Sequence, residues 1–153
     1  MALEDDILFL RRIATFRVLG PDALRVLAIS LETIHLRAGD VLFEEGEPAD
    51  SAYAVVAGAI RLRRATAKPL EEPILVGEGG LIGESALIVD TDRPASAIAS
   101  EPSTLYKIPR GIFMRLLESD VEAAAGLRAM IARRIDAVLD DLDTVLPRFE
   151  QNV

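Results

Sequence analysis

Glycine recurs through the middle of this sequence at short intervals, and that spacing limits the fold more than any other feature. The glycines between residues 39 and 83 are Gly39, Gly46, Gly58, Gly77, Gly79, Gly80 and Gly83. Short runs that suit strands lie between and beyond them, at 41–43, 53–56, 60–64, 74–76, 95–99 and 104–108. Short strands at intervals of about 8 to 12 residues, separated by turn residues, are typical of a barrel or sandwich of β-strands. The segment 65–73, with two prolines and two glutamates, is predicted to be an exposed hairpin loop.

Both ends of the chain change to helical spacing. Residues 3–13 carry apolar side chains at helical intervals, and Pro21 opens a second helix because proline is favoured at the first helical position. Beyond the β region the helical period returns in a short helix. A longer helix is predicted over 120–146, and Pro147 ends it.

The predicted helix 120–146 carries an apolar stripe. Its members are Leu127, Ile131, Ile135, Val138, Leu142 and Val145. Their spacings of 4, 4, 3, 4 and 3 residues are close to the heptad pattern of a coiled coil. At about 1.5 Å per residue the helix is roughly 40 Å long, which is more than a domain of this size covers. We therefore predict a homodimer through helix 120–146, with packing on the β-structure as the alternative for its first two turns.

The net charge of the 153 residues is −8, and the chain has no cysteine. Because a DNA-binding face needs a surplus of Lys and Arg, direct DNA binding is not expected. The lack of cysteine excludes zinc–thiolate sites, and no nucleophile is paired with a base, so neither an enzyme nor a metal or cofactor site is predicted. No apolar run is long enough to cross a bilayer, and the acidic start lacks the basic region of a signal peptide. We expect a cytoplasmic protein without a membrane segment.

Residues 83–97 combine features that suit one kind of ligand. Gly83 leads into a short helical turn that begins at Glu84, and Arg93 follows before the next strand. An arginine near free backbone N–H groups favours a phosphate. A carboxylate beside them would repel phosphate, so it is useful only if it accepts from hydroxyls of the same ligand. The combination therefore indicates a sugar phosphate or a nucleotide.

The segment 83–97 resembles the phosphate-binding cassette of the cyclic-nucleotide-binding domain family. Residues 39–47 and 53–60 resemble two further signatures of that family, at the right spacing. The resemblance covers nearly the whole chain as one domain, 1–153. It implies an α+β, mainly β fold: a jelly-roll-like double-stranded β-roll over 32–109, N-terminal helices over 1–31 and C-terminal helices, one of them long, over 110–146.

The resemblance also implies roles for the cassette residues. Glu84 is expected to accept from the ribose 2′-hydroxyl, and Arg93 to pair with the equatorial oxygen of the cyclic phosphate. Gly83 lets the backbone pass close to the ribose, and Leu87 and Ile88 anchor the short helix. The other predicted ligand-binding residues are Ser85 and Ala86, through their N–H groups, and Ala95 and Ser96. Two apolar side chains, Val76 and Leu81, are expected to wall the base.

Pro94 departs from the family pattern, in which the residue after the cassette arginine offers an N–H to the phosphate. Proline has no N–H, and it pushes Arg93 towards extended geometry. Loss of one charge-assisted hydrogen bond weakens binding by roughly tenfold to a hundredfold. The alternative is a loop remodelled around the order Arg-Pro.

The function that the resemblance implies is a sensor of cAMP or cGMP that signals by ligand-dependent repositioning of its C-terminal helix. We expect a stand-alone sensor, since only residues 147–153 follow the long helix, and a protein partner that reads the change. The alternative is a ligand-free dimerisation module in which Glu84 and Arg93 form a structural ion pair.

Overall fold

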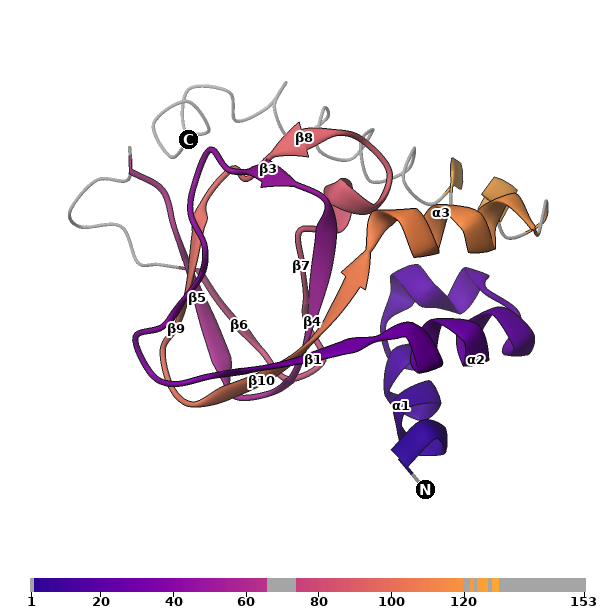
Figure 1. The fold of residues 1–153 in the computed structure, drawn as a ribbon, viewed down its shortest axis with the longest axis horizontal. Helices are drawn as coiled ribbons and strands as arrows, with labels where there is room; N and C mark the ends of the chain where they lie inside the picture. The colour runs from indigo at the N-terminus through magenta and orange to yellow at the C-terminus, as the bar shows by residue number, and fades with distance from the viewer. Residues whose placement is uncertain (1, 66–73, 120–121, 123, 127, 130–153) are drawn as a thin grey trace, which may run out of the picture.

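The computed structural model of the protein describes residues 2–65, 74–119, 122, 124–126, 128 and 129. Its helices are α1 (Ala2–Arg11), the 3₁₀ helix η1 (Ala14–Val18), α2 (Pro21–Ser30), the 3₁₀ helix η2 (Glu84–Leu87) and α3 (Arg110–Glu118). Its strands are β1 (Glu32–Leu36), β2 (Val41–Phe43), β3 (Pro48–Ala49), β4 (Ser51–Ala57), β5 (Ala59–Arg63), β6 (Ile74–Gly77), β7 (Leu81–Ile82), β8 (Thr91–Asp92), β9 (Ser96–Ala99) and β10 (Ser103–Pro109). Helices α1, α2 and α3 gather at one end of a roll of strands (Figure 1).

The two sheets of the roll are antiparallel throughout. One has the strand order β1-β10-β4-β7 and the other β2-β9-β5-β6, while β3 and β8 form a separate two-stranded sheet. Strands far apart in sequence are neighbours, as in the pairing of Thr33 with Tyr106. This arrangement confirms the α+β, mainly β fold with a β-roll.

Strand β4 separates two hydrophobic cores. Ala52 and Ala54 belong to a helix-side core, which also contains Phe16, Leu27, Leu87, Ile108 and Phe113. Tyr53 and Val55 belong to a roll core, which also contains Phe43, Ile60, Ile82, Ala97, Ala99 and Leu105. Because side chains alternate along a strand, β4 buries both of its faces. The roll and the helices are therefore packed against the same strand from opposite sides.

The predicted helices at the N-terminus are confirmed, with Pro21 at the start of α2. The segment between them forms η1, which the sequence pattern did not predict, and its Phe16 packs edge-on against Phe113 of α3. The predicted strands correspond to β2, β4, β5, β6, β9 and β10. The two-residue strands β3, β7 and β8 were not predicted, because a run of two residues shows no periodicity.

Two predictions fall outside the described residues. The exposed loop 65–73 is described only at Ala65. Of the helix predicted over 120–146, residues 122, 124–126, 128 and 129 are described, and these are helical. Its apolar stripe and the homodimer through it stay predictions. Among the helices that the structure describes, none has the length and apolar character needed to span a bilayer.

Candidate functional site

The cassette 83–97 begins at a sharp turn. Gly83 has φ +75° and ψ 34°, the left-handed conformation that glycine adopts without strain, and it precedes η2. The buried side chains of Ala86 and Leu87 fix this short helix, and Leu87 lies in the helix-side core with Ile88 packed against it. The predicted anchoring role of Leu87 and Ile88 agrees with this packing.

The backbone of Arg93 continues the pairing of β3 with β8. Its N–H donates to the carbonyl of Glu47 at 2.8 Å, and its carbonyl accepts from the N–H of Gly46 at 2.8 Å. Both backbone groups of Arg93 are thus used in a pairing of antiparallel type next to the pair Pro48–Asp92. The exposed Pro94 follows at the point where this pairing ends. Extended geometry at Arg93 is what a following proline favours.

The side chain of Arg93 enters the roll. The residue is 5% exposed, and its guanidinium carbon lies 4.2 Å from the centre of the Phe43 ring and 5.5 Å from that of Tyr53. A cation over an aromatic face is attracted by the ring quadrupole. Nη2 donates to the hydroxyl of Ser51 at 3.3 Å, and that hydroxyl donates to Asp50 Oδ1 at 3.1 Å. Two rings and a hydroxyl therefore hold the cation in the roll.

The other terminal nitrogen of Arg93 has no acceptor. Among the described residues, Nη1 is buried and has no hydrogen-bond partner. It faces Gly83, where a Cβ atom would lie 2.5 Å from Nη1, so a larger residue there would displace the guanidinium. A buried charged donor without a partner is costly, and an anion that reaches it would remove that cost. The arrangement thus provides an unused donor for an anionic ligand.

Burial also acts on the charge of Arg93. It lowers the pKa of the guanidinium from its ordinary value, while electrostatic interactions with Tyr53, Asp50 and Glu47 act in the opposite direction. Desolvation disfavours the charged form of a cation, and a nearby anion favours it. A bound phosphate would therefore stabilise the charged form of Arg93 beyond what its carboxylate neighbours do.

Glu84 is oriented by the N-terminal helices. The buried hydroxyl of Thr15, in η1, donates to Glu84 Oε2. The alternative from the sequence pairs Glu84 with Arg93; among the described residues Nη1 of Arg93 has no hydrogen-bond partner and Nη2 bonds to Ser51. An ionised carboxylate is an acceptor with several lone-pair positions, so it can accept from more than one hydroxyl.

The remaining predicted residues lie in several environments. Ser85 is exposed, and the N–H of Ala86 donates to the carbonyl of Gly83 at 3.0 Å. Ala95 is half-buried, and the hydroxyl of Ser96 accepts from the N–H of Glu45 at 2.9 Å. The structure thus brings Gly83 and Arg93 together, while it engages the Ala86 and Ser96 groups in other contacts.

The two predicted base-pocket residues pack on different cores. Val76 packs against the roll core, whereas Leu81 packs against the helix-side core. On β7 the side chain that lies in the roll core is that of the neighbouring Ile82, which pairs with Tyr53.

Four residues of the site were not predicted: Thr15, Phe43, Ser51 and Tyr53. Phe43 and Tyr53 lie in the two segments that resemble family signatures, and their rings are tilted against each other with centres 5.9 Å apart. An aromatic residue in each of two strands is a signal for a packed pair, although not for the arginine between them. No sequence signal marks Thr15 or Ser51, since hydroxyl residues are common in turns and strand ends.

Comparison with known proteins agrees with this geometry. The model of the cyclic nucleotide-binding domain family matches residues 33–120. The lysophospholipase NTE1 of Chaetomium globosum is 30% identical over 120 residues, which are 76% of this chain and 8% of that protein. The cyclic AMP receptor protein of Thermus thermophilus is 32% identical over 114 residues, 74% of this chain and 52% of that protein.

A solved structure extends the likeness to three dimensions. The N-terminal domain of a transcriptional regulator from Streptomyces coelicolor superposes with a TM-score of 0.75 at 31% identity, covering 88% of this chain and 94% of that one. This chain spans only a small part of the lysophospholipase and about half of the receptor protein. The match to the family model, together with the β-roll and the cassette between β7 and β9, places the chain in the cyclic nucleotide-binding domain family.

Proposed function

We propose that the chain binds cAMP or cGMP, with the cyclic phosphate at Nη1 of Arg93. The observation that carries this proposal is the buried, unpartnered Nη1 beside Gly83. A buried donor of this kind calls for an acceptor, and a charge-assisted bond to phosphate is among the stronger hydrogen bonds. A cyclic phosphate carries a negative charge, which would oppose the desolvation that lowers the pKa of Arg93.

The hydroxyl side of the ligand is assigned to Glu84. Its carboxylate is oriented by Thr15 and lies one residue from Gly83, so a ligand bound at Arg93 brings its sugar to the same turn. A carboxylate accepts from a ribose hydroxyl in the same way as from Thr15. The receptor protein among the relatives is named for cyclic AMP, which supports cAMP as the first nucleotide to try. The chain's own residues do not favour one base over the other, so the proposal covers both cAMP and cGMP.

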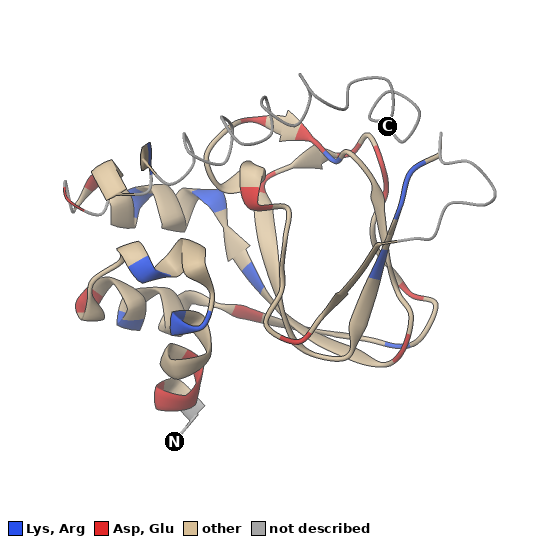
Figure 2. Cartoon of the chain, turned by 180° about the vertical axis from the view of Figure 1, so that it is seen from behind, with Lys and Arg blue, Asp and Glu red and all other residues tan. Residues whose placement is uncertain are grey.

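We propose that the bound nucleotide produces a signal through the helices and that the chain is not an enzyme. Helix α3 begins at Arg110, whose side chain contacts the turn after η2, so a ligand at the cassette is connected to the C-terminal part of the chain. We propose that the ligand repositions the helix that follows α3 and that a homodimer through 120–146 and a protein partner transmit the change. In Figure 2 acidic and basic positions are interspersed over the helices and the roll, which supports partners other than DNA. A cytoplasmic location is part of the same proposal.

The second candidate is a ligand-free interaction module. The stacking of Arg93 on Phe43 and its bond to Ser51 favour it, because they stabilise the cation in the absence of a ligand. Calorimetric titration of the chain with cAMP and with cGMP separates the two candidates. Heat of binding and a rise in melting temperature with either nucleotide support the sensor. The absence of both signals at millimolar ligand contradicts it.

A further inference from the structure

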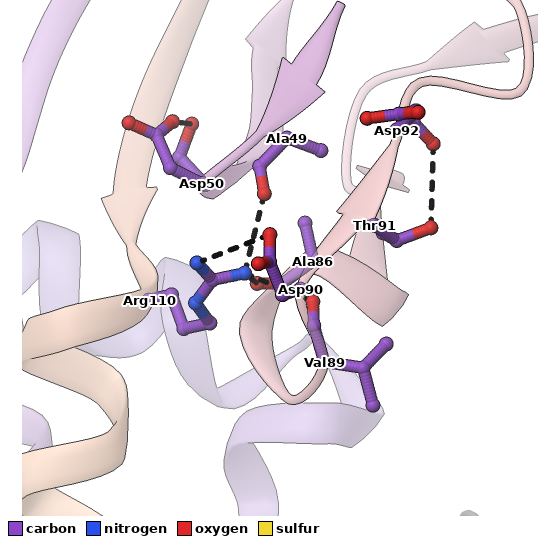
Figure 3. A network of polar contacts seen from close by, with 9 residues as sticks. Ala49, Asp50, Ala86, Val89, Asp90, Thr91, Asp92 and Arg110 are labelled. Carbon is purple, nitrogen blue, oxygen red and sulfur yellow. Dashed lines mark hydrogen bonds and ion pairs between the residues drawn. The ribbon is translucent and has the colours of Figure 1, made fainter. Parts of the chain in front are cut away.

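Arg110, the first residue of α3, lies where three segments of the site meet (Figure 3). Its Nη1 donates to the carbonyl of Val89 at 2.9 Å, to that of Ala49 at 3.2 Å and, most weakly, to that of Ala86 at 3.4 Å. The exposed Asp90 adds an ion pair at 3.9 Å. One guanidinium group therefore joins α3 to the end of β3 and to the turn that closes η2.

Two of the three carbonyls that Arg110 contacts, those of Ala86 and Val89, lie at and just beyond the C-terminal end of η2. Ala86 is in the last turn of η2, and Val89 lies two residues beyond its end. The last carbonyls of a helix have no partner within it and carry partial negative charge, which favours a cation. In contrast, the pair with Asp90 contributes little, because the Asp90 side chain is 93% exposed and screened by water. The contacts with the main chain are therefore the ones that hold the turn.

Arg110 is also connected to Arg93 through the chain segment 49–51. The N–H of Arg110 donates to the carbonyl of Asp50 at 2.9 Å, and its side chain holds the carbonyl of Ala49. The next residue, Ser51, bonds to Nη2 of Arg93. The backbone that presents Ser51 to Arg93 is thus fixed from its other side by Arg110.

We propose that Arg110 is a positioning residue for the nucleotide site, which sets the cassette turn and the Ser51–Arg93 contact relative to each other. In this proposal Arg110 contacts no ligand atom. Through the carbonyls of Val89 and Ala86 it positions the turn that follows Gly83 and Glu84. Through the carbonyls of Ala49 and Asp50 it positions the segment that holds Arg93. This inference rests on the proposed binding of a cyclic nucleotide at Arg93.

The test is calorimetric titration of the full chain with cAMP and cGMP, well below the melting temperature of every variant. We expect Arg110→Met to weaken binding by about tenfold, since a misplaced cassette loses part of a charge-assisted contact, and Arg110→Lys to restore part of the loss. Two matched controls leave the carbonyl contacts in place: Asp90→Asn removes only the exposed ion pair, and Arg115→Met changes an exposed arginine on the same helix. Both controls should stay within about twofold of the wild-type affinity.

A role limited to stability would lower the melting temperature of Arg110→Met and leave its affinity unchanged, and that result overturns the proposal. An equal loss of affinity in Asp90→Asn would also overturn it, because the ion pair and not the main-chain contacts would then matter. Absence of binding by the wild-type chain contradicts the proposed function itself, so the two failures are distinguishable. Should Arg110→Met not fold, Arg110→Gln takes its place: wild-type affinity in a folded Arg110→Gln protein contradicts the positioning role.

Discussion

Two arginines approach the same chain segment from opposite sides, and their surroundings differ in one decisive respect. Nη1 of Arg110 donates to main-chain carbonyls on two segments, whereas Nη1 of Arg93, although more deeply buried, has no partner among the described residues. Folding alone accounts for Arg110, because its bonds satisfy groups that would otherwise be unpaired. The free nitrogen of Arg93 has no such role within the fold, and an anionic ligand would give it an acceptor. The contrast is the reason why we propose the phosphate site at Arg93 and a positioning role for Arg110.

The largest expected difference in stability is between two variants without ligand, each of which lacks one of the two arginines. Arg110→Met leaves main-chain carbonyls unpaired and should lower the free energy of unfolding by about 1–3 kcal/mol. Arg93→Met removes a buried cation with an unpaired donor, and it also loses the cation–π contact and the long bond to Ser51. The gain and the losses offset, so the free energy of unfolding should stay within about 0.5 kcal/mol of wild type. Urea unfolding of the three proteins measures both differences. A loss in Arg93→Met as large as that in Arg110→Met would break the comparison.

A smaller effect on stability is expected at Gly83, whose missing side chain leaves room for the guanidinium of Arg93. Gly83→Ala places a Cβ at a position with φ +75° and 2.5 Å from Nη1, so we expect a loss of about 1–2 kcal/mol in the free energy of unfolding and weaker nucleotide binding. Gly111→Ala is the matched control, because an added Cβ there meets nothing within 4 Å in the first turn of α3. That control should gain about 0.5–1 kcal/mol from its higher helix propensity. Equal changes in the two variants would show that the space beside Arg93 is not needed.

The smallest effect at ordinary pH concerns a polar contact that involves neither arginine. The hydroxyl of Tyr106, on β10, donates to Asp6 of α1. Burial, the bond to Asp6 and the charges of Asp6 and Asp5 raise the pKa of Tyr106 from 10.0 to about 12. Because the folded state favours the neutral phenol, its contribution to stability is complete below the unfolded pKa and is lost as pH rises through the folded one.

Unfolding of the wild type and of Tyr106→Phe between about pH 8 and pH 12 tests this contact. The difference in stability between the two proteins should be constant up to about pH 10 and then shrink. A constant difference over the whole range would contradict the raised pKa. Nucleotide affinity should be the same in both proteins at neutral pH, which sharpens the assignment of binding to the Arg93 side of the molecule.

Much of the fold could be predicted because its signals are local. The glycine spacing indicated a barrel or sandwich of strands, the family resemblance implied the β-roll, and helical spacing indicated α1 and α2. The strands β3, β7 and β8 escaped prediction because two residues form a strand only where a distant partner supplies the pairing.

The site divides in the same way. Gly83, Glu84 and Arg93 were predictable from their chemistry within one short segment. The free Nη1, the Thr15–Glu84 bond and the main-chain contacts of Arg110 were not. Each contact joins residues that are 21 to 69 positions apart, and the free Nη1 depends on which atoms fail to meet. Leu81 and Val76 pack against different cores, and for Leu81 this follows from the register in which β7 pairs with β4. No local sequence pattern predicts that register.

The most direct test of the account compares cAMP and cGMP binding by the wild type and by Arg93→Met in one calorimetric series. The account predicts binding by the wild-type chain and an affinity about a hundredfold lower in the variant, because the phosphate loses its buried charged donor. The variant should keep the wild-type free energy of unfolding, so that the loss is one of recognition. Equal affinity in a folded Arg93→Met protein would contradict the claim that the unpartnered nitrogen of Arg93 is the phosphate site.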